Sequence, residues 1–161
     1  YRDKYADLSD ETYIKALEKD KGEVLISHLE VEGKDDLLEP IKITYRYTMD
    51  NAVEEIGDKL YFSPLLFLST QENPFKQDER KLPIDLMYPM SDKYMVNVML
   101  PEGYDVESLP ENQALDFADK TGEFKYLINQ NGRFLQIIVE LNINTSFILF
   151  SDFFIYSSLI H

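Results

Sequence analysis

Apolar residues that recur at every second position are the feature that most constrains how this chain can fold. Phe124, Tyr126 and Ile128 recur in this way and lead into Asn131-Gly132, a dipeptide typical of tight turns. Apolar residues then return at every second position over residues 135–143. A period of two places successive side chains on opposite faces of a strand. Two such runs joined by Asn-Gly predict a β-hairpin with one buried face.

Further strands are predicted over residues 24–31, 41–48, 59–67 and 94–100. The alternation is clearest over 41–48, residues 94–100 alternate likewise, and residues 24–31 and 59–67 are weaker candidates. Pro64 is expected to bend or end the third of these strands, because proline cannot donate a backbone hydrogen bond. A turn at residues 119–122 is expected to join the hairpin to a short strand before it. With about eight or nine strands and no long helical connection, the fold class is predicted to be mainly β, an antiparallel β-sandwich.

Short helices are predicted at both ends of the chain. Ser9 and Asp10 are favourable N-cap residues, and Gly22 is a typical C-terminal stop for the helix that follows them. Near the other end, Ser151 can cap a short C-terminal helix over residues 153–160, where apolar residues recur at helical spacing.

These elements predict a simple domain organisation. Residues 1–22 form a linker and an N-terminal helix, and residues 23–161 form the β-sandwich domain. The polar, proline-bounded stretch at residues 73–83 is the candidate for a subdomain boundary. The polar run at Tyr1 is not a signal peptide, so we expect a fragment or a processed piece of a longer protein.

Charge and composition exclude several classes of function. The chain has 16 Lys and Arg against 30 Asp and Glu, which gives a formal charge of −14. Nucleic-acid binding needs a basic surface that neutralises phosphates, so this class of function is not expected. Cysteine is absent, which excludes disulfides, thiolate nucleophiles and zinc-thiolate sites. Residues 141–160 are long enough to cross a bilayer, but they contain Asp152 and several asparagines and serines, so no membrane span is expected.

The sequence contains no recognisable catalytic constellation. It has neither a G-x-S-x-G elbow nor a glycine-rich phosphate-binding loop. His28 lies in a predicted strand and is expected to be a surface or cross-strand histidine, while His161 is the last residue. Paired-carboxylate glycosidase chemistry stays open because acids are abundant, although nothing marks two of them. We therefore expect no enzymatic activity, no catalytic residue and no cofactor.

One acidic cluster is a candidate calcium site. Asp50, Glu54, Glu55 and Asp58 lie within nine residues of one another. Calcium prefers such carboxylate oxygens, but the spacing is not that of an EF-hand loop. A solvated loop is the competing interpretation, and it is the one that we favour.

Several short motifs carry a family resemblance. They are Asn73-Pro74-Phe75, Arg80, Pro83-Ile84-Asp85, Leu100-Pro101-Glu102-Gly103-Tyr104, Val106-Glu107-Ser108-Leu109-Pro110 and the upstream segment 50–58. Through them the chain, from about residue 8 to residue 160, resembles the C-terminal β-rich region of bacterial transglutaminase-like multidomain proteins. In that family, a papain-like Cys-His-Asp core is flanked by two β domains of unknown function.

The resemblance implies a non-catalytic accessory domain. Such a domain would pack on or position a catalytic domain encoded upstream in the same polypeptide, and no catalytic residue carries over onto this chain. The family also implies export to the periplasm or the cell surface. The runner-up interpretation is a glycan- or peptide-binding module that uses exposed tyrosines or a strand edge.

Two structural features would discriminate between these interpretations. A row of exposed aromatic side chains on one sheet face would favour glycan binding. A contiguous apolar patch near the N-terminal helix would favour intramolecular docking.

The most specific of these motifs, Leu100-Pro101-Glu102-Gly103-Tyr104, also has a structural interpretation that does not depend on the family resemblance. Leu100 is expected to close a strand, Pro101 to end its pairing, and Gly103 to adopt a positive φ in a turn. A further strand is then expected to begin at Tyr104 and to stop at Pro110.

Overall fold

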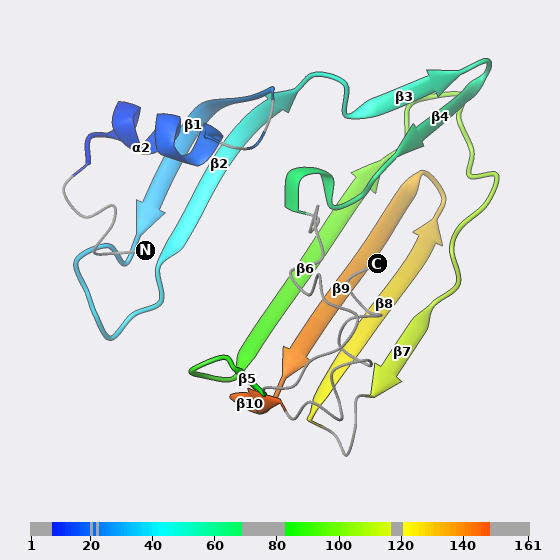
Figure 1. Ribbon diagram of the computed structural model, residues 1–161. Helices are drawn as coiled ribbons and strands as arrows, with labels where there is room; N and C mark the ends of the chain where they lie inside the picture. The colour runs from blue at the N-terminus through cyan, green and yellow to red at the C-terminus, as the bar shows by residue number, and fades with distance from the viewer. Residues whose placement is uncertain (1–7, 20, 22, 69–82, 117–120, 149–161) are drawn as a thin grey trace. The chain divides into compact units, whose positions relative to one another are not determined.

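The computed structural model describes residues 8–19, 21, 23–68, 83–116 and 121–148 (Figure 1). The chain divides into two compact units, residues 1–67 and residues 68–161. The predicted boundary at residues 73–83 falls almost wholly outside the described residues, and so does the predicted C-terminal helix.

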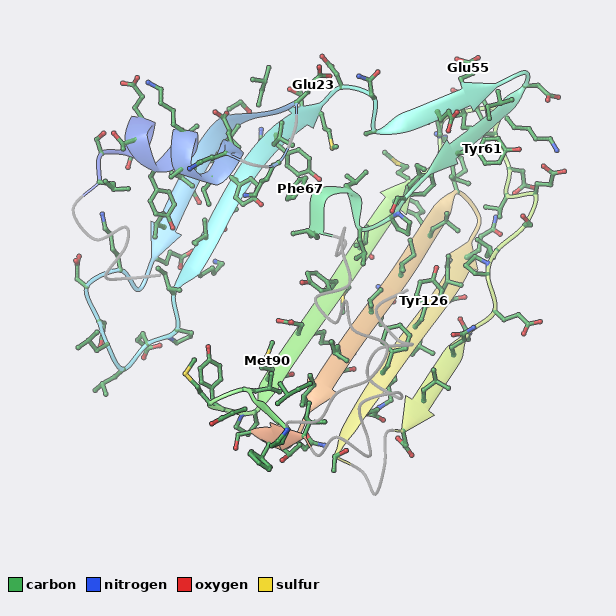
Figure 2. The ribbon with its side chains drawn as sticks, viewed as in Figure 1. Glu23, Glu55, Tyr61, Phe67, Met90 and Tyr126 are labelled. Carbon is green, nitrogen blue, oxygen red and sulfur yellow. The ribbon has the colours of Figure 1, made fainter. Side chains whose placement is uncertain are left out.

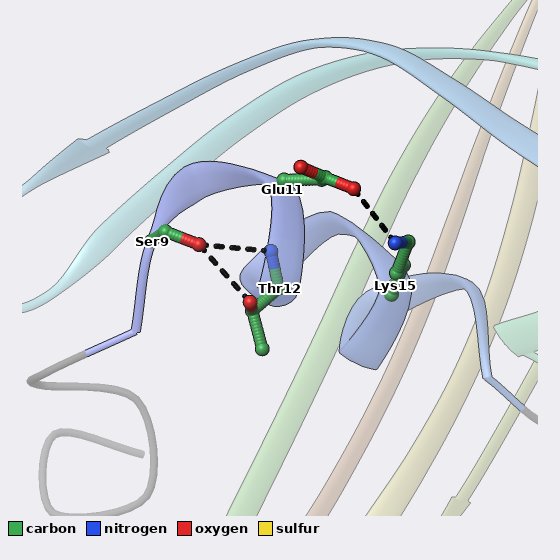
Figure 3. Close-up of polar contacts among 4 residues, drawn as sticks. All are labelled: Ser9, Glu11, Thr12 and Lys15. Carbon is green, nitrogen blue, oxygen red and sulfur yellow. Dashed lines mark hydrogen bonds and ion pairs between the residues drawn. The ribbon is translucent and has the colours of Figure 1, made fainter.

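The first unit begins with helix α2 (Asp10–Glu18), and local side chains explain where it starts. Ser9 is the N-cap: its Oγ accepts a hydrogen bond from the Thr12 amide at 3.4 Å and lies 3.0 Å from the Thr12 hydroxyl (Figure 3). Lys15 donates to Glu11 one turn earlier, at 2.7 Å. The predicted N-terminal helix is thus confirmed, although it ends at Glu18, with Lys19 as its C-cap, before the predicted stop at Gly22.

A two-stranded antiparallel ribbon follows the helix. It pairs β1 (Val24–Glu32) with β2 (Lys42–Met49). A bulge leaves Ser27 outside the ladder, since Ile26 pairs with Tyr47 and His28 with Arg46. A bulge shifts the alternation by one residue. The shift explains why the inward residues change phase from 24 and 26 to 29 and 31.

The helix and the ribbon share a small apolar core. Tyr13 and Leu17 of α2 are buried with Val24 and Ile26 of β1. The carboxylate of Glu18, the last residue of α2, accepts the Ile26 amide at 2.7 Å, which fixes the helix against the strand next to the bulge.

An aromatic group lies beside this core. The Lys21 ammonium is 5.7 Å from the ring centroid of Tyr45 and 5.3 Å from that of Phe67, distances typical of cation–π contacts. Tyr47 packs edge-on against the same Phe67 ring, with 5.3 Å between the two centroids. Residues far apart in the sequence thus hold the ribbon to the end of the first unit.

A second hairpin completes the first unit. It joins β3 (Val53–Ile56) to β4 (Lys59–Phe62), and Figure 2 labels Glu55 and Tyr61 on its two strands. The strand predicted over 59–67 is therefore shorter than expected. It ends before Pro64, and residues Leu66–Leu68 form the short 3₁₀ helix η1.

The second unit is built on a four-stranded antiparallel sheet of order β6-β9-β8-β7. The strands are β6 (Met90–Met99), β7 (Gln113–Asp116), β8 (Gly122–Asn131) and β9 (Phe134–Ile143). The three long strands lie side by side in Figure 1, and β7 extends one edge. A further short pair, β5 (Ile84–Asp85) with β10 (Phe147–Ile148), packs Ile148 against apolar residues at the end of the sheet.

The hairpin predicted from the alternation is confirmed. Asn131 pairs with Phe134, so Gly132 and Arg133 are the two central residues of the turn. Gly132 has a φ of +56°, which glycine adopts without a Cβ clash. The inward residues of β9 are Leu135, Ile137 and Val139, which are all buried.

The chain after β6 corrects one expectation. Strand β6 ends at Met99 before Pro101, and Gly103 has a φ of +87°, both as predicted. Residues 104–110, however, form no strand. Gln130 of β8 instead holds this segment by donating to the Asp105 carboxylate at 3.1 Å. Just after the segment, the Asn112 side chain accepts the Ile128 amide of β8 at 2.7 Å.

The fold class is thus mainly β, with antiparallel sheets and one helix near the N-terminus. Packing of two sheets into a sandwich stays a prediction. Within the described ranges, no helix is long and apolar enough to cross a membrane.

Candidate functional site: the outer face of the four-stranded sheet

The two faces of the four-stranded sheet differ sharply in burial. The inner face carries Leu135, Ile137 and Val139, and Ile137 is only 1% exposed. It also carries Tyr94 of β6 and Tyr126 of β8, which pair with Val139 from either side; Tyr126 is labelled in Figure 2. Partial burial raises the pKa of both tyrosines above 10.0. The inner face is therefore core, and the opposite, outer face is left to solvent.

The outer face contains an apolar row that the strand register creates. Met95 of β6 lies opposite Ile138 of β9, and Ile138 lies opposite Leu127 of β8. Adjacent strands are about 4.8 Å apart, so the row runs about 10 Å across three strands. Met95 is 56% exposed and Leu127 is also exposed, while Ile138 is half-buried between them.

A second apolar pair lies further along the same face. Met99 of β6 lies opposite Phe134 of β9, and both side chains are exposed, Phe134 by 60%. Met99 is four residues from Met95, or about 13 Å along the strand. We call Met95, Met99, Leu127, Phe134 and Ile138 the outer-face patch.

Amide side chains separate the two parts of the patch. Asn97, Gln136 and Asn129 lie opposite one another across the three strands. Gln136 donates to the Asn97 carbonyl oxygen at 3.2 Å. These groups can form hydrogen bonds with a partner without carrying a charge, which suits the centre of a contact surface.

Charged groups border the patch on the side away from the hairpin turn. Lys93 lies 3.8 Å from Glu140, and Lys125 lies 2.5 Å from Glu123. The hydrogen bond from Lys125 is the main reason that the pKa of Glu123 is lowered, and the same bond raises the pKa of Lys125. Beside them, Ser91 donates to Asn142 at 2.6 Å. An apolar centre with a paired, charged rim is the usual composition of a protein contact surface.

The acidic residues predicted as a calcium site are not brought together. Glu54 and Glu55 are neighbours in β3, so their side chains point to opposite faces of the hairpin. Asp50 lies in the turn after β2, Asp58 lies in the β3–β4 turn, and all four side chains are exposed. Among the residues that the structure describes, no three His, Asp or Glu side chains converge as metal ligands would.

The other predicted side chains are also placed at the surface. His28 is exposed beside the bulge in β1, with its Nε2 3.0 Å from the Glu30 carboxylate. This is the surface position that the sequence predicts. His161 lies outside the described residues.

Among the residues that the structure describes, the exposed tyrosines do not form a row on one sheet face. They lie on β2, on β4, before β6 and in the loop after β6, as Tyr47, Tyr61, Tyr88 and Tyr104. On the outer face of the four-stranded sheet, Phe134 is the one aromatic residue among those described. The described residues therefore do not include the row of exposed aromatic side chains that would favour glycan binding.

The outer-face patch was missed from the sequence, although a signal for it exists. Each of the three long strands contains three consecutive apolar residues, 94–96, 126–128 and 137–139. The middle residue of each triplet breaks the period of two and must face outward. Only the register shows that the three outward residues form one row.

Comparison with known proteins gives one match. Residues 58–161 match the model of the DUF3858 family, a domain of unknown function with a solved structure. No curated protein and no solved structure matches the chain. The matched region contains the whole four-stranded sheet and most of the motifs that carried the family resemblance. The match covers well over half of the chain, and the chain belongs to the DUF3858 family.

Proposed function

We propose that this chain is a non-catalytic accessory domain that packs on a neighbouring domain of the same polypeptide through its outer-face patch. The observation that carries the proposal is the register of β6, β9 and β8. It aligns Met95, Ile138 and Leu127 in one exposed apolar row. Exposed apolar patches on soluble domains usually mark contact surfaces.

The location of the patch modifies the earlier expectation. A patch near the N-terminal helix was named as the observation that would favour docking, whereas the outer-face patch lies on the sheet of the second unit. A sheet face of this kind suits docking against another layer of secondary structure, because sheets pack face to face at about 10 Å. The one-sided burial at Ile137 supports the further proposal that the inner face belongs to a β-sandwich.

The identity of the neighbouring domain rests on the family resemblance. The motifs in residues 73–110 resemble those of transglutaminase-like multidomain proteins, so we propose a transglutaminase-like or protease-like domain as the neighbour. Export to the periplasm or the cell surface is proposed on the same basis. The absence of cysteine is compatible with it.

Thermal unfolding of the isolated chain and of the complete gene product tests the docking. Contact with a tethered neighbour adds stability by mass action, about 2.7 kcal/mol if the effective concentration is a hundred times the dissociation constant. Met95→Lys places a charge in the apolar row. It should remove this added stability while leaving the isolated chain unchanged.

Met87→Lys is the matched control for that experiment. Met87 is also strongly exposed, but it lies before β6 and outside the outer-face patch. The same chemical change at residue 87 should leave the added stability intact. Equal melting temperatures for the isolated chain and the complete gene product, or equal losses from both variants, would contradict the proposal.

A further inference from the structure

The loop between β1 and β2 exposes two adjacent leucines. Leu37 is 81% exposed and Leu38 is 95% exposed. The loop covers residues 33–41 at one end of the ribbon (Figure 1). Leucine is among the residues most often buried, so a pair this exposed calls for a physical explanation.

The loop is built to hold this conformation. The Asp36 carboxylate accepts the Leu38 amide at 2.9 Å, a local bond that fixes the chain at the tip. Gly33 has a φ of +70°, and a Cβ at this position would lie 2.4 Å from the Pro40 carbonyl oxygen. Glycine is therefore required where the two ends of the loop approach each other. The leucines are presented on a preformed tip.

The surroundings of the leucines are acidic. Asp35, Asp36 and Glu39 are all exposed, whereas Lys34, the one basic residue in the loop, is half-buried. The whole chain also carries a formal charge of −14. This combination indicates an apolar contact surrounded by negative charge, which a partner with a positive rim complements.

The same charges argue against a lipid surface. Bilayer leaflets rich in anionic lipid repel a loop and a chain of this sign. Two leucine side chains also hold about eight carbon atoms together, fewer than one myristoyl chain, which alone gives only marginal membrane binding. A protein pocket is the better fit.

We propose that the leucine tip, Leu37 and Leu38 with their acidic flanks, inserts into an apolar pocket on a partner protein whose rim carries Lys or Arg. The inference does not depend on the outer-face patch, because the tip lies in the first unit and the patch in the second. Failure of one proposal therefore leaves the other standing.

A photo-crosslinking amino acid at position 38 tests the insertion in cells that make the protein. The expected result is an adduct with one protein, at a residue inside an apolar pocket flanked by Lys or Arg. The same crosslinker at Leu25, an exposed residue of β1, is the control and should give no such adduct. An equal yield at both positions, or an adduct outside such a pocket, would overturn the proposal.

Charge reversal provides the second readout. Asp35→Lys should lower the adduct yield at position 38 at least threefold, because it places a positive charge against a positive rim. Glu102→Lys changes the net charge equally, but in the exposed loop after β6, and should leave the yield unchanged. Equal effects of the two variants would show that the acidic flank plays no part, and the proposal would fail.

Flotation with vesicles examines the lipid alternative directly. We expect the chain not to float with vesicles of phosphatidylcholine, either pure or mixed with phosphatidylglycerol. Flotation that is lost in the Leu37→Ser/Leu38→Ser variant would assign the tip to a membrane and overturn the protein-pocket proposal.

Discussion

Truncation of Ile137 should show how strongly the inner face of the four-stranded sheet stabilises the second unit. Ile137→Ala removes three carbon atoms from a side chain that is 1% exposed. At about 0.8 kcal/mol for each buried methylene, the lost transfer free energy is about 2.4 kcal/mol. The cavity that remains adds to this loss, so the unfolding free energy should fall by roughly 3–4 kcal/mol, within the usual range for such truncations.

The assay must report on the second unit alone, because the chain contains two compact units that need not unfold together. Native-state hydrogen exchange, read by mass spectrometry on peptides from β8 and β9, gives the opening free energy of this sheet. Met95→Ala is the matched control, because residue 95 lies on the outer face of the same sheet. It should change the opening free energy by about 0.5 kcal/mol or less.

If Ile137→Ala lowers the opening free energy by less than about 1 kcal/mol, the assignment of the inner face as core is refuted, because truncating a fully buried isoleucine to alanine costs more than this. Equal losses from Ile137→Ala and Met95→Ala would refute the distinction between the two faces. The proposed docking surface depends on that distinction.

Three further predictions concern pH and capping. Burial raises the pKa of Tyr94 and Tyr126, so above about pH 10 the unfolded chain should lose these phenolic protons more readily than the folded chain. The free energy of unfolding should therefore fall as the pH rises. Tyr94→Phe should make this fall less steep in urea unfolding. The hydrogen bond from Lys125 is the main reason that the pKa of Glu123 lies below 4.5. The ionised Glu123 carboxylate therefore stabilises the fold, and this stability is lost as the pH falls through the lowered pKa. Lys125→Met should raise that pKa in an NMR titration. Ser9→Ala should lower the free energy of unfolding by about 0.5–2 kcal/mol, measured by circular dichroism; no loss would contradict the role of Ser9 as the N-cap of α2.

Local patterns in the sequence predicted the elements that local physics determines. The period of two gave the β8–β9 hairpin, and Ser9 gave the start of α2, because both depend on neighbouring residues alone. The bulge at Ser27 is also visible in the sequence, because the apolar residues change phase after Ile26. The pattern of a single strand, however, does not show which of its faces is buried.

The wrong expectations came from long-range pairing. Residues 104–110 have the composition of a strand, yet they pair with no strand in the part of the chain that the structure describes, and single side-chain bonds such as that from Gln130 to Asp105 hold the segment instead. For the calcium candidate, which the sequence did not favour over a solvated loop, the period of two along β3 directs Glu54 and Glu55 to opposite faces of the hairpin. The apolar row through Met95 could be seen only once three strands were aligned in register.

Methionine oxidation mapped by mass spectrometry tests the central claim most directly. Met95 and Met99 lie in the outer-face patch, and Met87 lies outside it, so one chain contains both the probe and its reference. In the isolated chain all three should oxidise readily. In the complete gene product, docking predicts that Met95 and Met99 are protected while Met87 is not. Unchanged oxidation of Met95 and Met99 would contradict the assignment of this face as the docking surface.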